Sequence, residues 1–147
     1  MSTQLDKNFE YLCDEIRVSD GKFVIMGVGK SGHIGQKISA TLSSTGTGSV
    51  FIHPTEAAHG DMGLIEKKDI VLLISNSGET DEIINIIPSL KRLSYKISSL
   101  TGKKNSTISK SADIPIVLNT KNEACPLGLA PTTSTTAALQ VHILLGN

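Results

Sequence analysis

The stretch that decides the fold is Ile70-Val71-Leu72-Leu73-Ile74-Ser75-Asn76-Ser77-Gly78-Glu79-Thr80. It opens with a short apolar run, which is typical of a strand buried on both faces of a sheet. Residues 75–80 then combine small polar side chains with a glycine, and a segment with helical spacing follows them. A buried strand that ends in such a turn and continues as a helix indicates a βαβ unit.

The same alternation of strands and helices extends along the whole chain. It predicts an α/β fold, a three-layer αβα sandwich around a five-stranded parallel sheet of the flavodoxin-like type. Ligands of such sheets bind beyond the carboxyl ends of the strands, which points to the segments after strands one, three and five. Strands are expected at residues 23–28, 50–53, 70–74, 95–100 and 114–118. Helices are expected at residues 4–17, from the glycines after the first strand to about residue 44, at 81–93, shortly after residue 106, and at 131–145.

Length, charge and cysteine content limit the class of protein. The 147 residues suffice for one compact domain. Lys plus Arg and Asp plus Glu number 14 each, and this balance argues against nucleic acid or an anionic membrane as the partner. Cys13 and Cys125 lack metal-ligand spacing, and no signal peptide or membrane-spanning run is visible. We therefore expect a cytoplasmic protein with reduced thiols, no metal and no cofactor.

Residues 75–80 are the first candidate binding segment. The hydroxyl groups of this segment are hydrogen-bond donors, and its glycine lets backbone amides converge. The helix that follows offers free N–H groups and the positive end of its dipole to an anion. A helix cap needs only one such residue, so the density favours a phosphate site of neutral donors over an ordinary cap. The acid within it, Glu79, is unexplained by this reasoning. The candidate ligands are Ser75, Asn76, Ser77, Gly78 and Thr80.

A glycine-rich segment, residues 27–32, follows the first strand and opens a helix in the pattern G-x-G-x-x-G. A dinucleotide site would require an acid at the end of the second strand, and Glu56 lies past that strand, so NAD binding is a minority alternative. A Walker A loop is excluded because its first glycine is absent. Gly35 is expected to let the helix pack close to the sheet, while Lys30 and Ser31 are candidate ligand contacts.

Two further candidates lie elsewhere in the chain. Glu123 follows the fifth strand and precedes a loop bounded by proline and glycine, and His59 precedes Gly60 between the second and third strands. A carboxylate and an imidazole can exchange protons near neutral pH. Loop acids and loop histidines are also common as plain surface residues, so both interpretations stay open here.

Four segments in this order resemble the sugar isomerase (SIS) domain: GVGKSGHIG (27–35), HPTEAAHGDMG (53–63), SNSGETDE (75–82) and NEACPLGLAPTTSTTA (122–137). More narrowly, they are similar to the bacterial arabinose-5-phosphate isomerases. The resemblance implies interconversion of D-ribulose 5-phosphate and D-arabinose 5-phosphate through an enediol, for synthesis of Kdo in lipopolysaccharide or capsules. It also implies a homo-oligomer, a dimer or tetramer, with active sites shared between subunits.

The resemblance assigns roles as well. It implies that Ser75, Ser77 and Thr80 hold the phosphate and that the catalytic set is Lys30, Glu82, Glu123 and His59, with His59 reaching a neighbouring subunit. Relatives normally continue into a His-Pro-Gly-Gly segment and often add CBS domains, so residues 1–147 are expected to be a single SIS domain without them. The alternative function is a non-catalytic sugar-phosphate sensor or truncated binding module.

Overall fold

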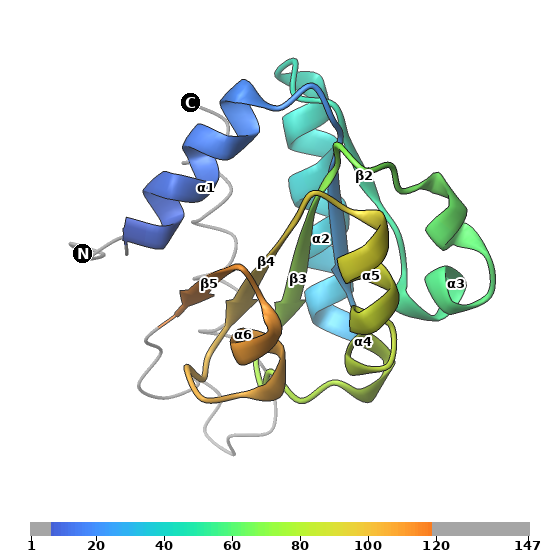
Figure 1. Ribbon diagram of the computed structural model, residues 1–147, viewed down its shortest axis with the longest axis vertical. Helices are drawn as coiled ribbons and strands as arrows, with labels where there is room; N and C mark the ends of the chain where they lie inside the picture. Colours follow the sequence, from blue (N-terminus) through green and yellow to red (C-terminus); the bar gives the residue numbers. More distant parts are fainter. Residues whose placement is uncertain (1–6, 119–147) are drawn as a thin grey trace.

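The computed structural model describes residues 7–118, which form one five-stranded, all-parallel sheet with helices around it (Figure 1). The strands are β1 (Phe23–Gly27), β2 (Ser49–Phe51), β3 (Ile70–Ser75), β4 (Lys96–Thr101) and β5 (Ile114–Val117). The helices are α1 (Lys7–Val18), α2 (Gly29–Ser44), α3 (Pro54–Ala58), η1 (Asp61–Leu64, a 3₁₀ turn), α4 (Asp81–Ile84), α5 (Ile87–Leu93) and α6 (Thr107–Ser111).

The strand order β2-β1-β3-β4-β5 places the topological switch between β1 and β3. These two strands pair in parallel from Phe23 opposite Ile70 to Gly27 opposite Ile74. Their carboxyl ends therefore lie side by side, and the segments that follow them leave the sheet at the same edge. The predicted parallel αβα architecture is confirmed.

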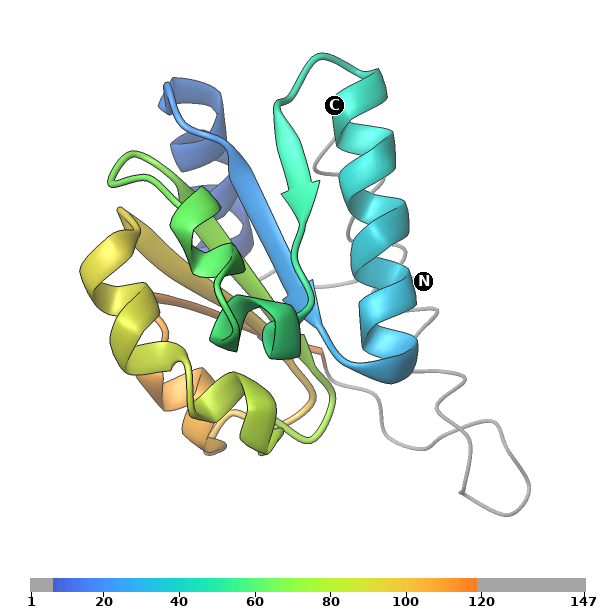
Figure 2. The same cartoon turned by 90° about the vertical axis from the view of Figure 1, so that its right-hand side faces the viewer.

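Helices cover both faces of the sheet, as the view in Figure 2 shows. On β3 the side chains of Ile70, Leu72 and Ile74 join one core with α1 and α2. Val71 and Leu73 face the other core, with α3 to α6. Residues 70–74 of β3 are all apolar because their side chains contribute to two cores, which is why this part of the strand shows no polar alternation.

Two segments differ from the sequence expectation. The single helix expected over 81–93 is divided into α4 and α5, because Pro88 has no N–H and its ring would clash with the carbonyl four residues earlier. The second strand ends at Phe51 instead of residue 53, and His53 becomes the N-cap of α3, where its side chain accepts a hydrogen bond from the Thr55 amide. The helix expected at 131–145 lies outside the described residues.

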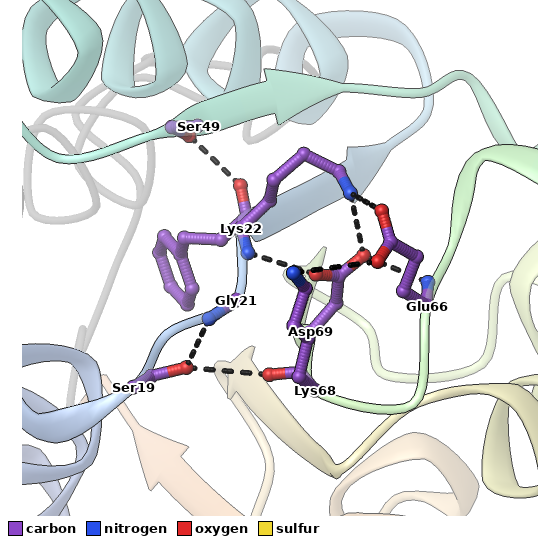
Figure 3. A network of polar contacts seen from close by, with 8 residues as sticks. Ser19, Gly21, Lys22, Ser49, Glu66, Lys68 and Asp69 are labelled. Carbon is purple, nitrogen blue, oxygen red and sulfur yellow. Dashed lines mark hydrogen bonds and ion pairs between the residues drawn. The ribbon is translucent and has the colours of Figure 1, made fainter.

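A polar network ties the amino ends of β1 and β3 together (Figure 3). The carboxylate of Asp69 is fully buried and accepts hydrogen bonds from the amides of Lys22 and Glu66, both at 2.8 Å. The ammonium of Lys22 lies 3.0 Å from Asp69 and 3.1 Å from Glu66. This network fixes one end of the strand pair whose other end carries the candidate site.

Within residues 7–118, none of the helices combines the length and the apolar character needed to cross a membrane.

Candidate active site

The candidate site lies where β1 and β3 end. Residues 76–80 leave β3 and lead into α4, and the first turn of α2 leaves β1. Because β1 and β3 are neighbours, these two segments meet at the switch point that sequence analysis selected. The chain between β4 and α6 also contacts the β3 segment, since the amide of Gly102 donates to the carbonyl of Asn76 at 2.9 Å.

The loop of residues 75–80 is held by its own hydroxyl groups. The Gly78 amide donates to Ser75 Oγ at 3.0 Å, and Ser75 Oγ lies 2.8 Å from Thr80 Oγ1. The Glu79 amide donates to Ser77 Oγ at 3.1 Å. The amides of residues 78 and 79 therefore donate to hydroxyl oxygens of the loop itself. The sequence had instead suggested that these amides converge on a ligand.

These bonds leave hydroxyl protons for an outside acceptor. Ser75 is buried and accepts a hydrogen bond from the Gly78 amide, and either hydroxyl can be the donor in its 2.8 Å contact with Thr80. The Ser75–Thr80 pair therefore has two O–H groups, of which the contact between them uses one, and Ser77, which is exposed and accepts from the Glu79 amide, keeps its own O–H. When an amide donates to a hydroxyl group, that hydroxyl group becomes a stronger donor to the next acceptor. The loop can thus present neutral donors to an anion without any cation.

The start of α2 supplies the helix dipole at this site. Val28 is its N-cap and makes no side-chain capping hydrogen bond, and Gly29 adopts the left-handed region at φ 58°. A helix of 16 residues with an uncapped start favours an anion by roughly 0.3–1 kcal/mol. The dipole that we had expected from a helix over 81–93 is weaker, because α4 has only four residues.

Glycines bring α2 close to the sheet. A Cβ on Gly32 would lie 2.8 Å from the carbonyl oxygen of Gly27, and one on Gly35 would lie 3.0 Å from the ring of Phe51. The role expected for Gly35 is therefore confirmed. The close approach seats the first turn of α2, with Lys30 and the partly buried Ser31, directly beyond β1.

Three of the four expected catalytic residues lie in the described part of the chain. Lys30, Glu82 and His59 are exposed, and none of their side chains forms a hydrogen bond or ion pair within residues 7–118. Glu82 lies in α4, which contacts α3, the helix that ends next to His59. The helices thus bring these two segments together at the same edge of the sheet. Glu123, the fourth residue, lies outside the described residues.

Sequence reasoning left Glu79 unexplained, and the structure assigns it a partner. Its carboxylate Oε1 accepts a hydrogen bond from the amide of Thr107, the first residue of α6, at 2.8 Å. Hydrogen bonds from the Thr107 backbone and side chain, aided by nearby Lys103 and Lys110, lower the pKa of Glu79. A partner 28 positions away in sequence has no local signal. The Glu79 carboxylate is therefore bonded to the start of α6.

Comparison with known proteins gives a consistent result. A model of the SIS domain matches residues 15–145. Arabinose 5-phosphate isomerases KdsD from Yersinia pestis and Shigella flexneri are 54% and 51% identical to this chain over 135 residues. The matches cover 92% of this chain and 41% of each relative, so the chain spans about two fifths of their length. The structure of Escherichia coli CFT073 c3406 in complex with arabinose 5-phosphate has a TM-score of 0.91 and 43% identity, covering 99% of this chain and 79% of that one.

Proposed function

The chain belongs to the SIS domain family, and from this premise we propose that it interconverts D-ribulose 5-phosphate and D-arabinose 5-phosphate. One observation carries the proposal: a loop of neutral donors lies beside the uncapped start of α2 at the switch point, and Lys30 is exposed there without a partner in residues 7–118. The similarity to KdsD isomerases and to the sugar-phosphate complex of c3406 supports this choice of substrate.

The phosphate of the substrate binds at the loop of residues 75–80. A phosphate monoester carries a charge of about −1.5 to −2 at neutral pH. Hydroxyl donors of Ser77 and Thr80, polarised by the amides behind them, hold this charge together with the start of α2. Ser75, being buried and bonded inside the loop, shapes the site from behind. The single cation of the first α2 turn is then left for the reacting end of the sugar.

The chemistry is a proton transfer between adjacent carbons. A base removes the proton from one carbon of the sugar and returns it to the next, and donors stabilise the oxyanion of the enediol. We assign Glu123 as the base, Lys30 as the group that stabilises the enediolate, and Glu82 as a residue that positions a sugar hydroxyl. The phosphate dianion is expected to raise the pKa of Glu123 toward neutrality. His59 assists ring opening or proton shuttling, including in the site of a neighbouring subunit.

The setting of the enzyme follows from the same proposal. The protein is a cytoplasmic homo-oligomer, a dimer or tetramer with shared active sites, whose described part is a single SIS domain. It works without metal or cofactor, and its product supplies Kdo synthesis for lipopolysaccharide or capsule.

The decisive experiment is an isomerase assay of the 147-residue chain with arabinose 5-phosphate, beside the Glu123→Gln variant. We expect turnover by the wild-type chain and loss of turnover with retained sugar-phosphate binding in the variant. Glu10→Gln, an exposed change on α1, is the matched control and should keep the wild-type rate. Binding without turnover by the wild-type chain would identify a sensor or binding module, and a wild-type rate for Glu123→Gln would refute the assigned base.

The anion loop is tested by a pair of serine variants. Ser77→Ala removes an outward donor and should raise KM more than it lowers kcat. Ser75→Ala removes the bridge between Gly78 and Thr80, so it should lower thermal stability as well as affinity. An effect of Ser77→Ala mainly on kcat would show that the loop does more than anchor the phosphate.

A further inference from the structure

The loop of residues 75–80 is fastened from outside at two neighbouring residues. The carboxylate of Glu79 accepts from the Thr107 amide at 2.8 Å, and the carbonyl of Gly78 accepts from the Ile108 amide at 3.0 Å. Both donors belong to the first turn of α6. The loop and this turn are thus joined by two parallel bonds, one through a side chain and one through the backbone.

The contact is also tight. Gly78 adopts the left-handed region at φ 67°, and a Cβ there would lie 2.0 Å from Ser106 Oγ. Ser106 is itself fixed, because its hydroxyl donates to the Lys103 carbonyl at 2.9 Å and accepts from the Ser109 amide as the N-cap of α6. The loop of residues 75–80 therefore packs closely against a first turn of α6 that is held by its own hydrogen bonds.

Fixing residues 78 and 79 fixes the donors of the anion site, because the amides of these residues orient Ser75 and Ser77. We propose that Glu79 is a positioning residue that latches the 75–80 loop to the first turn of α6 and holds the phosphate donors in their binding geometry. This inference rests on the proposed function for its effect on phosphate binding, whereas the latch itself is formed by contacts within the protein. The proposal explains why an acid lies within a loop that binds phosphate: the Glu79 carboxylate is bonded to the Thr107 amide of α6.

The two ends of the latch can be removed separately. Glu79→Ala removes the acceptor, and Glu79→Gln keeps an uncharged acceptor. Thr107→Pro removes the donor, at a first helical position that tolerates proline, and Ser106 before it is already extended (φ −71°, ψ 158°), as a residue preceding proline must be. Glu10→Ala, on exposed α1, is the matched control for loss of a surface carboxylate.

Affinity for inorganic phosphate and for arabinose 5-phosphate is measured by calorimetry, and KM and kcat are measured where turnover occurs. We expect Glu79→Ala and Thr107→Pro each to weaken phosphate binding several-fold and to raise KM, with kcat nearly unchanged. Glu79→Gln should recover part of the affinity. The double variant Glu79→Ala, Thr107→Pro should be no weaker than either single variant, because both remove the same bond. Wild-type affinity in Glu79→Ala, or additive losses in the double variant, would overturn the proposal.

Hydrogen exchange of the Thr107 and Ile108 amides, without ligand, separates the latch from the proposed function. Protection of Thr107 in the wild-type chain, lost in Glu79→Ala, supports the latch. An unprotected Thr107 amide in the wild-type chain overturns it. If the Thr107 amide is protected but the wild-type chain binds neither phosphate nor the sugar phosphate, the proposed function fails and the positioning role fails with it. A loss of kcat in Glu79→Ala with wild-type behaviour in Thr107→Pro would mean that Glu79 acts on the substrate directly.

Discussion

Replacing Asp69 with alanine should destabilise the fold more than any comparable change of a surface acid. The Asp69 side chain is fully buried and accepts two amide hydrogen bonds of 2.8 Å in addition to its ion pair of 3.0 Å with Lys22. Asp69→Ala leaves these donors without an acceptor, and an unsatisfied buried donor costs about 1–3 kcal/mol. Two buried donors lose their acceptor, so we expect Asp69→Ala to cost about 2–6 kcal/mol, whereas the Lys22 ammonium, whose side chain is 36% exposed, can be solvated by water.

Glu66 provides the matched comparison, because its carboxylate lies 3.1 Å from the same Lys22 ammonium but its side chain is 58% exposed. Urea unfolding followed by circular dichroism measures both variants. With a slope of about 1–3 kcal/mol per molar urea, Asp69→Ala should lower the midpoint by about 1 M or more. Glu66→Ala should lower it far less, because exposed ion pairs are screened by water. Equal shifts for the two variants would refute the reasoning that burial decides the cost.

The same carboxylate predicts a pH dependence. Burial alone would raise the pKa of Asp69, but the amides of Glu66 and Lys22 and the Lys22 ammonium outweigh it, so the pKa lies below its ordinary value. A depressed pKa means that the unfolded chain binds the proton more readily than the folded one. The stabilisation is therefore complete above the unfolded pKa of about 3.9 and is lost as the pH falls through the lower folded value. The stability difference between wild type and Asp69→Ala should shrink below about pH 4, and a constant difference would contradict this account.

Three further pairs of substitutions test other parts of the fold by thermal or urea unfolding. Ser99 Oγ in β4 is buried without a hydrogen-bond partner among the described residues, whereas Ser98 Oγ donates to the Ile114 carbonyl at 2.9 Å. Ser99→Ala should therefore be neutral or stabilising, and Ser98→Ala should cost about 1 kcal/mol. A larger loss of stability for Ser99→Ala than for Ser98→Ala would contradict this assignment. Gly78→Ala should destabilise the protein and weaken phosphate binding, whereas Gly46→Ala, also at positive φ but with no atom within 4 Å of the new Cβ, should show only the smaller backbone cost. His53→Ala should cost about 0.5–2 kcal/mol through loss of the α3 cap, and His53→Asn should restore most of it, since asparagine also accepts from the amide two residues on.

Local sequence determined the elements and the edge of the sheet where the site lies. A short apolar run such as residues 70–74 must be buried, and its length and the turn residues after it favour a strand over a helix. The order of strands and helices then requires a parallel sheet, and the carboxyl ends of parallel strands share one edge. The position of the donor loop at residues 75–80 follows from these facts alone. The single helix expected over 81–93 was wrong, because the prediction overlooked Pro88, and proline inside a helical pattern interrupts it.

Tertiary structure decided which side chains are available to a ligand. Nothing near Glu79 in the sequence indicates that its carboxylate is bonded to Thr107, because the partner comes close only when β4 and α6 pack beside β3. Likewise, Ser75 and Ser77 are both serines of one loop, yet one hydroxyl is buried inside it and the other faces outward. Helix and strand patterns depend on neighbours within a few residues, whereas hydrogen-bond partners depend on the packing of segments far apart in the chain. The sequence thus predicted a candidate site, and only the fold showed which of its polar side chains are bonded within the protein and which are exposed.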